Sequence, residues 1–469
     1  MRKNKNGLKI IALLLPIIIY GLSNITKVNF DALFVVGVFL YGIILWVKVG
    51  IDWPSLYVIM MLMLVPKLSI QSVFSSSFGH PTFIFLMFTF ALTHALSQTP
   101  FIKRVAIYFV NLPFAKKSIK HLIISFLGAT LLMGLIMSPT VLFFILYPVL
   151  QEIFVTLKIK KGDNIAKLML MGLVMTVSLS SGMTPIAHVF PLLSLNVFTS
   201  ITSIEISYVS YMAFAIPFGL IIFASLLTLL FFTYRHDLDS KKLLENIDIE
   251  ITKIRHQEII TVAVFMFVVL LWIIPDILGY KSINIAFPPM IGVLLLALIQ
   301  VDEKPLLNLN ESFTKGMNWP SLLMTAAALA LGSALTNPDI GIITYITQHT
   351  SSYIENMPGI LLILIFIVWA SLQSNISSHM VTSQLVSSIA VPIFISVESL
   401  SASAIAALIG MLASLGCATP PSMPYVAVAT SSGYVSPKDM MSVGFKLMGI
   451  IIILSLLIGY NLANYFIGG

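Results

Sequence analysis

Long apolar runs separated by short polar segments follow one another along the whole chain. About 20 apolar residues cross the ~30 Å hydrocarbon layer of a bilayer as an α-helix. The runs are continuous and do not alternate with period two, so they indicate helices and not barrel strands. The pattern predicts an all-α polytopic membrane protein with about 11 transmembrane helices, at residues 9–26, 30–48, 54–65, 80–99, 165–198, 207–233, 258–279, 283–300, 319–337, 402–432 and 442–466.

Composition excludes a soluble domain and several enzyme classes. Of the 469 residues, 58% are hydrophobic and 10% are charged, whereas about 25% are charged in a typical soluble domain. The net charge of +7 comes from Lys and Arg in short loops, a pattern typical of membrane topology and not of a nucleic-acid partner. The sequence has no phosphate-binding Walker loop and no HExxH motif, and its single cysteine, Cys417, excludes a disulfide. We therefore expect no enzyme and no cofactor, and any transport must use an ion or solute gradient.

The basic segment MRKNKNGLK precedes the first apolar run. We interpret residues 1–29 as an N-terminal transmembrane helix whose basic flank stays in the cytoplasm, which predicts a multi-pass protein of the cell membrane. Basic residues also predict that the loop 101–120 and the linker 236–257 are cytoplasmic. Segment 101–115 is amphipathic and is predicted to lie along the cytoplasmic interface, with 339–355 as its counterpart outside.

Two further apolar stretches, 121–156 and 359–397, are flanked alike at both of their ends. Residues 121–156 have a basic flank on each side, so both ends are predicted to be cytoplasmic. The second stretch lies within residues 316–437, which contain no Lys or Arg, so both of its ends are predicted to face outside. Each stretch is either two full spans or a re-entrant hairpin, and we expect one hairpin entering from each face. The basic flanks of the first stretch are Lys116, Lys117 and Lys120 before it, and Lys158, Lys160, Lys161 and Lys167 after it.

Similar strings recur in the same order in the two halves of the chain. ALTHALSQ at 91–98 matches ALGSALTN at 330–337, and a Thr-Pro pair follows in each half. The charge pattern orients the halves oppositely, which predicts an inverted-topology repeat, the architecture of secondary transporters. The first repeat would be 30–235, with hairpin 121–156 and a broken helix at 165–198. The second would be 258–469, with hairpin 359–397 and a broken helix at 402–432.

The Thr-Pro pairs interrupt membrane-length segments, in SLSSGMTPIAH at 178–188 and in ASLGCATPPSMP at 413–424. Non-helical backbone survives in a bilayer only where protein or a water-filled cavity satisfies it. Each span is therefore predicted to be two half-helices whose N-termini suit an anion and whose carbonyl groups suit a cation.

The hairpin tips are predicted to complete this site. Ten residues before Pro148 the sequence is Ser138-Pro139-Thr140. The same spacing before Pro392 gives Thr382-Ser383-Gln384, and Ser374-Asn375 followed by Ser377, Ser378 and His379 is the alternative tip.

This constellation resembles the divalent anion/sodium symporter family of the ion-transporter superfamily. The resemblance rests on the two Thr-Pro breaks, on TPPSMP at 419–424 and on GYVSPKDM at 433–440. It implies Na⁺-coupled or exchange transport of a dicarboxylate by an elevator motion in a homodimer. Pro139 and Ser383 stand where the family carries asparagine. The resemblance assigns substrate contacts to Ser138, Thr140, Thr184, Pro185, Thr382, Ser383, Gln384, Thr419 and Pro420, and bound Na⁺ to Ser138, Gly182, Met183, Thr382 and Ala418.

Other interpretations of the same residues are open. Ser and Thr in membrane helices often bond to their own backbone or join helices. His188 and His379 could compensate charge, carry a proton or be structural. A cation/proton antiporter would need an intramembrane carboxylate, and none is predicted at the site. An intramembrane hydrolase would need a nucleophile and a base, but Ser377 and His379 would face different ways on a helix.

Overall fold

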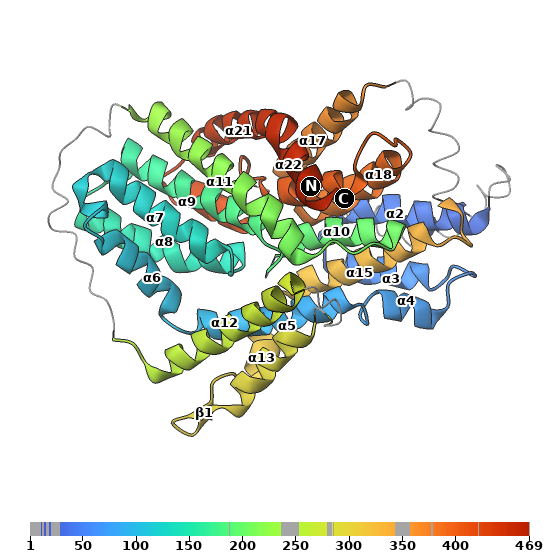
Figure 1. Cartoon of the computed structure of the whole chain (residues 1–469), viewed down its shortest axis with the longest axis horizontal. Helices are drawn as coiled ribbons and strands as arrows, with labels where there is room; N and C mark the ends of the chain where they lie inside the picture. Colours follow the sequence, from blue (N-terminus) through green and yellow to red (C-terminus); the bar gives the residue numbers. More distant parts are fainter. Residues whose placement is uncertain are drawn as a thin grey trace.

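The computed structural model is built almost entirely from helices (Figure 1). The predicted all-α polytopic fold is confirmed. The structure describes residues 29–186, 188–235, 253–278, 284, 286–342, 357–376, 379–420 and 422–468, together with residues 11, 14, 15, 18 and 19. The predicted first helix, most of the linker 236–257 and most of segment 339–355 lie outside these residues.

The first half of the chain supplies one helical hairpin and one broken helix. The turn of the hairpin lies between α7 and α8, and the break lies between α9 and α10. The elements of this half are α2 (Phe30–Lys48), α3 (Trp53–Leu62), α4 (Ile70–Ser76), α5 (Pro81–Ser97), α6 (Phe101–Asn111), the 3₁₀ turn η1 (Ala115–Lys117), α7 (Ile119–Gly134), α8 (Pro139–Thr156), α9 (Asn164–Met183), α10 (Val189–Thr202) and α11 (Tyr208–Thr233).

The second half repeats this order, with the hairpin α17–α18 before the broken helix α19–α20. A small antiparallel pair, in which Gln300 faces Pro305, precedes it. The elements of this half are α12 (His256–Ile277), α13 (Phe287–Leu298), β1 (Gln300–Val301), β2 (Lys304–Pro305), α14 (Leu309–Glu311), the π-helical turn η3 (Ser312–Gly316), α15 (Trp319–Thr336), α17 (Gly359–Ile376), α18 (His379–Ile395), α19 (Ala402–Ser414), α20 (Pro424–Ser431), α21 (Pro437–Leu454), the π-helical turn η4 (Ser455–Gly459) and α22 (Tyr460–Ile467).

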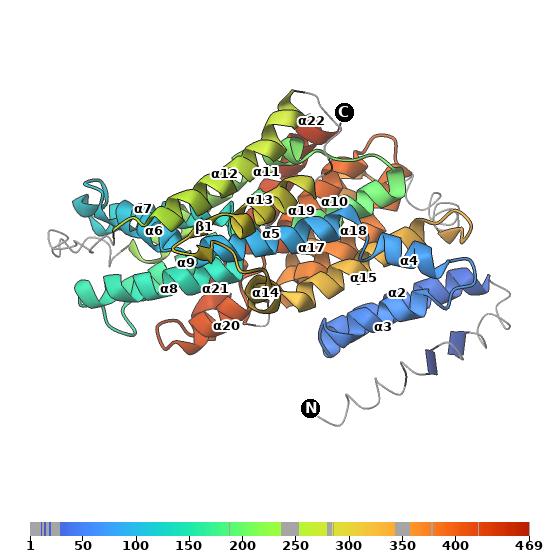
Figure 2. The ribbon, with the colours of Figure 1, turned by 90° about the horizontal axis from the view of Figure 1, so that it is seen from below.

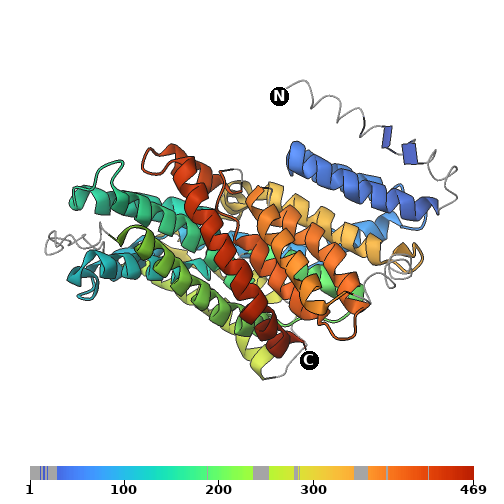
Figure 3. The ribbon, with the colours of Figure 1, turned by 90° about the horizontal axis from the view of Figure 1, so that it is seen from above.

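The first halves of the two broken helices, α9 and α19, are buried on nearly every side. All residues from Leu168 to Met183 of α9, and from Ala404 to Ser414 of α19, are buried. A helix that is apolar all round belongs in the core of a large protein or a membrane bundle. The α10 segment packs against both α18 and α19, and α9 packs against α11 and α7. The long helix of α21, η4 and α22 runs diagonally between the two hairpins (Figure 3), and α2 and α3 lie beside α15 (Figure 2).

Proline sets several of the boundaries near the breaks. Thr184, which precedes Pro185, is extended with φ −137° and ψ 149°, because the proline ring disfavours helical geometry in the residue before it. The α9 helix therefore ends at Met183. Proline is accepted at a helix start, since its missing N–H needs no partner there, and Pro139 begins α8 while Pro424 begins α20.

Fewer single helices than expected are long enough to cross a membrane. Within the described residues, seven pass on length and composition, or eight if the bent pair α4 and α5 is one span. The predicted span 9–26 lies mostly outside the described residues, and the longest helices found at 54–65, 283–300 and 402–432 have only 10, 12 and 13 residues. Two of the seven, α8 and α17, belong to the hairpins. Whether the two hairpins are re-entrant and the repeats inverted stays a prediction.

The predicted amphipathic segment forms the helix α6. Its residues Ile102, Ala106, Ile107 and Val110 form one buried face. Arg104, on this helix, donates from Nη2 to Glu258 Oε2 of α12 at 2.8 Å, and both side chains are largely buried. The helix α6, which connects α5 to the first hairpin, is therefore fixed to α12 by a buried ion pair.

Candidate functional site

Each hairpin meets the break of the broken helix from its own half. We call the contact between the turn 135–138 and the described residues of the break, 184–186 and 188, the first junction. The contact between the facing ends of α17 and α18 and the described residues of the second break, 415–420 and 422–423, is the second junction. Both junctions are built from side chains of one segment that bond to backbone groups of the other.

Two side chains of the break hold the first junction. Thr184 donates its hydroxyl to the carbonyl oxygen of Leu135 at 2.5 Å. His188 Nε2 lies 2.8 Å from the carbonyl oxygen of Gly134. Because a carbonyl can only accept, His188 carries its proton on Nε2 here. The break is thus tied to the last turn of α7.

Four bonds hold the second junction. The carboxamide oxygen of Asn375 accepts from the backbone N–H groups of Cys417 and Ala418, at 3.0 and 2.8 Å. Thr419 donates its hydroxyl to the carbonyl oxygen of Asn375. His379 Nε2 lies 2.8 Å from the carbonyl oxygen of Gly416. The side chain and the backbone of one asparagine therefore fix the second break.

The two breaks lie against each other. A Cβ atom on Gly182, at the end of α9, would lie 3.1 Å from the carbonyl oxygen of Met411 and 3.2 Å from Ser414 Cβ on α19. A Cβ on Gly410 would lie 3.0 Å from Pro191 Cα of α10. Glycine at both positions thus allows the broken helices to approach at their interruptions, which brings the two junctions to one region of the molecule.

Each hairpin also contacts the broken helix of the other half. Ser383 of α18 donates its hydroxyl to the carbonyl oxygen of Phe190 at 2.6 Å, and the rings of Phe190 and His379 are 5.1 Å apart. From the first hairpin, Phe143 stacks on Tyr425 of α20 with ring centroids 5.6 Å apart. The site is therefore a cross-connected unit of two hairpins and two broken helices.

The tip of the second hairpin differs in position from the favoured prediction. The α18 helix begins at His379, so Thr382, Ser383 and Gln384 lie inside it and are buried. The prediction assumed equal distances from each tip to the internal proline. Pro148 is the tenth residue of α8, but Pro392 is the fourteenth of α18, which adds about one helical turn. Asn375, in the alternative tip, is the second-last residue of α17, and Ser377 and Ser378 lie outside the described residues.

The remaining predicted residues are distributed around the junctions. Ser138 is the N-cap of α8 with no side-chain cap bond, and Ser138 and Thr140 are half-buried. Gln384 donates to the carbonyl oxygen of Ala328 on α15 at 3.4 Å. Pro185 and Pro420 lie in the breaks. Three residues were predicted to bind an ion through their backbone. Gly182 and Met183 are the last two residues of α9, and Ala418 lies in the second break.

Two tyrosines that the sequence analysis did not single out support the breaks. Tyr211 donates its hydroxyl to the carbonyl oxygen of Gly182 at 2.6 Å. The hydroxyl groups of Tyr425 and Ser178 are 2.7 Å apart. A buried tyrosine hydroxyl usually finds a hydrogen-bond partner. A tyrosine within an apolar run was therefore the sequence signal that could have indicated these contacts.

The charge around the junctions comes from helix ends. The helices α8, α10, α18 and α20 all begin there, and a helix N-terminus carries about half a positive charge and free N–H groups. No Lys or Arg occurs in residues 121–157 or 316–437. Within the described part of the chain, no group of three or more His, Cys, Asp or Glu could hold a metal ion. The arrangement suits a small anion.

Comparison with known proteins agrees with this geometry. The citrate transporter family, CitMHS, matches residues 41–410. None of the curated proteins matches the chain. Among solved structures, the YdaH transporter of Alcanivorax borkumensis is similar, with a TM-score of 0.56, 12% identity, and coverage of 84% of this chain and 87% of that one. The resemblance drawn from the Thr-Pro breaks is confirmed as a resemblance to transporters.

Proposed function

The chain belongs to the citrate transporter family, and we propose that its substrate is a dicarboxylate or the tricarboxylate citrate. It is a multi-pass membrane protein and a secondary transporter of an anion, not an enzyme. The observation that carries the proposal is that four helices, α8, α10, α18 and α20, begin at the two junctions, in stretches of sequence (121–157, 168–234 and 316–437) that contain no Lys or Arg. Such ends bind carboxylates through N–H groups and dipoles.

The first junction is the proposed place of the substrate carboxylate. Ser138 makes no side-chain cap bond to the N-terminus of α8, so its hydroxyl is available to a ligand. Thr140 lies in the first turn of the same helix and is half-buried. In the second junction, by contrast, the oxygen of Asn375 already accepts two N–H groups. We therefore propose Ser138 and Thr140 of the first hairpin as the carboxylate contacts.

A cation gradient is the proposed driving force. The resemblance predicts Na⁺, with solute exchange as the alternative. The contacts support a proton instead, because both lone pairs of Asn375 Oδ1 are used and the carbonyl oxygen of Gly182 accepts from Tyr211. Among the described residues, Nδ1 of neither His188 nor His379 has a hydrogen-bond partner, and both atoms are buried. Because burial disfavours a charged imidazolium, we propose that one of these nitrogens takes up a proton only when water or the anion reaches it during transport.

The proposed transport cycle is an elevator motion. The hairpins and broken helices form the cross-connected unit described above, and α2, α3 and α15 form a layer beside it. We propose that this unit moves against that layer, in a homodimer in the cell membrane with the N-terminus in the cytoplasm. Packing of the moving unit through its own hydrogen bonds supports its movement as one body.

Uptake by purified protein in proteoliposomes tests the function. Radiolabelled citrate and succinate would be supplied with an inward Na⁺ gradient, with an inward H⁺ gradient, or with unlabelled substrate inside and no ion gradient. The proposal predicts uptake of at least one carboxylate, with the H⁺ gradient giving the largest stimulation. Stimulation by Na⁺ alone would overturn the proton and keep the carboxylate. No uptake of either by folded protein would overturn the carboxylate itself.

A further inference from the structure

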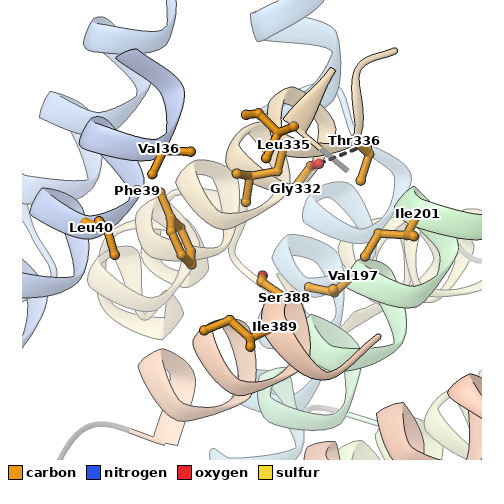
Figure 4. Close-up of a pocket in the computed structure, with 11 residues that line it drawn as sticks. Val36, Phe39, Leu40, Val197, Ile201, Gly332, Leu335, Thr336, Ser388 and Ile389 are labelled. Atoms are coloured by element: carbon orange, nitrogen blue, oxygen red, sulfur yellow. Dashed lines mark hydrogen bonds between the residues drawn. The ribbon is translucent and has the colours of Figure 1, made fainter. Parts of the chain in front are cut away.

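A cavity of about 130 Å³ lies away from both junctions, between the α2–α15 layer and the α10–α18 pair (Figure 4). Phe39 reaches toward it from α2, Gly332 and Leu335 line it from α15, Val197 lines it from α10 and Ser388 from α18. Part of its space is open because Gly332 carries no side chain. A Cβ on Gly332 would meet nothing nearer than Ser200 Oγ at 3.7 Å.

The wall of the cavity presents hydrocarbon. Its hydroxyl groups are engaged within their own helices: Thr336 donates to the carbonyl oxygen of Gly332 at 3.0 Å, and Ser388 accepts from Gln384 at 3.4 Å. The other lining side chains are aliphatic or aromatic. An apolar cavity of about this size stays dry and takes up hydrocarbon. Water and the transported anion are therefore poor occupants.

One side of the cavity reaches the exposed surface of the described part of the chain. Leu40 lines the cavity and is 53% exposed, and Ile44, one turn further along α2, is also exposed. Leu40 is the eleventh residue of the 19-residue helix α2, which places it about 15 Å from the start of the helix. The sequence predicts that residues 30–48 span the bilayer, which would place Leu40 near its middle, where acyl chains and no headgroups are present.

We propose that an acyl chain of a bilayer phospholipid enters this cavity beside Leu40 and lies between α2–α15 and α10–α18. The depth and the apolar wall together select a hydrocarbon chain over a peptide, whose backbone polar groups would be unsatisfied there. The site is independent of which anion is transported. Since α10 and α18 also carry His188 and His379, the bound chain would contact the helices that form both junctions.

Photocrosslinking in a bilayer tests the site. The protein would be reconstituted with a phosphatidylcholine that carries a diazirine in the middle of one acyl chain, and labelled residues would be mapped by mass spectrometry. The proposal predicts label on the inner wall, at Val197, Ser388 or Ile389, and not only on the outer residue Leu40. Gly332→Leu fills the cavity and should lower inner-wall labelling by about tenfold, the loss for a 1.4 kcal/mol weaker site.

Gly128→Leu is the matched control, because Gly128 in α7 also has open space around its Cβ position and lies outside the cavity. It should leave inner-wall labelling unchanged. Ser388→Leu fills the cavity from the opposite wall and replaces Gly332→Leu if that variant does not fold. Absence of inner-wall label in the wild type would overturn the proposal. Equal labelling of the wild type and a folded cavity-filled variant would do the same.

Discussion

The two junctions share one contact and differ in almost everything else. In both, the threonine of a Thr-Pro pair donates to a carbonyl oxygen at the end of the first hairpin helix, Thr184 to Leu135 and Thr419 to Asn375. A histidine bonds to a glycine carbonyl in both, but His188 reaches from break to hairpin whereas His379 reaches from hairpin to break. The shared contact indicates a common plan for the two halves.

The difference lies in the asparagine. Asn375 pairs two N–H groups of the second break, and the first junction has Pro139 at its turn and no such amide. A buried N–H without an acceptor is costly, so the second break is held firmly while the first keeps polar groups for a ligand. The second junction is therefore the anchored one, and the first is the proposed place of the substrate.

Removing the anchor should have the largest effect on stability. Asn375→Ala leaves the N–H groups of Cys417 and Ala418 without acceptors, and we expect the free energy of unfolding to fall by about 2–4 kcal/mol. Thermal and denaturant unfolding of the purified protein would measure this. Ser374→Ala is the matched control, because Ser374 bonds only within its own helix. Equal stability of both variants would contradict an anchoring role.

A side chain between the two breaks should cause the next largest loss of stability. Gly182→Ala places a Cβ about 3.1 Å from Met411 O and should destabilise the protein by about 1–3 kcal/mol. Gly128→Ala, in open space on α7, should be neutral or stabilising because alanine favours helices. The same unfolding assay compares the two. If Gly182→Ala were as stable as Gly128→Ala, the breaks would not be in close contact.

Replacing either histidine should lower stability by a similar amount, but the two variants should differ in H⁺-driven uptake. Each of His188→Phe and His379→Phe removes one bond to a carbonyl, worth about 1 kcal/mol. Only Thr184 would then hold the first junction, whereas Asn375 and Thr419 would still hold the second. We expect the larger loss of H⁺-driven uptake in His188→Phe, with exchange partly retained. Unchanged stimulation by the H⁺ gradient in both variants would remove the histidines from coupling.

Ser383→Ala should have the smallest effect on transport. The variant loses one bond to the carbonyl oxygen of Phe190, which costs about 1 kcal/mol. Since Ser383 joins α18 to α10 in the folded state, we expect the KM for uptake to be unchanged. Uptake at several substrate concentrations measures it. A raised KM with normal folding would return Ser383 to the substrate site that the resemblance predicts.

The sequence located the breaks because their cause is local. Proline removes a backbone donor and restricts the residue before it. Thr184-Pro185 therefore marks the end of α9 within a few residues, and Thr419-Pro420 marks the second break. The two hairpins could also be predicted from local features. Each is an apolar stretch long enough for two helices, and its two flanks are alike in charge.

The second tip and the partners of the side chains could not be predicted in this way. The spacing to Pro392 misplaced the tip because nothing in the sequence reveals the additional turn of α18. The partners of His188, His379 and Tyr211 are carbonyl oxygens, which every residue carries, and packing alone selects the glycines that they contact. Local chemistry predicts where a helix breaks, and tertiary contacts decide what the break binds.

The most direct test of the first junction as the substrate site is the concentration dependence of carboxylate uptake by Ser138→Ala in proteoliposomes, beside Ser383→Ala and the wild type. Ser138 makes no side-chain cap bond, so its removal should change stability by less than about 0.5 kcal/mol. The account predicts that Ser138→Ala raises the KM by about tenfold, as expected for loss of a hydrogen bond to a charged group. An unchanged KM in Ser138→Ala, with a raised KM in Ser383→Ala, would contradict it and place the substrate at the second hairpin.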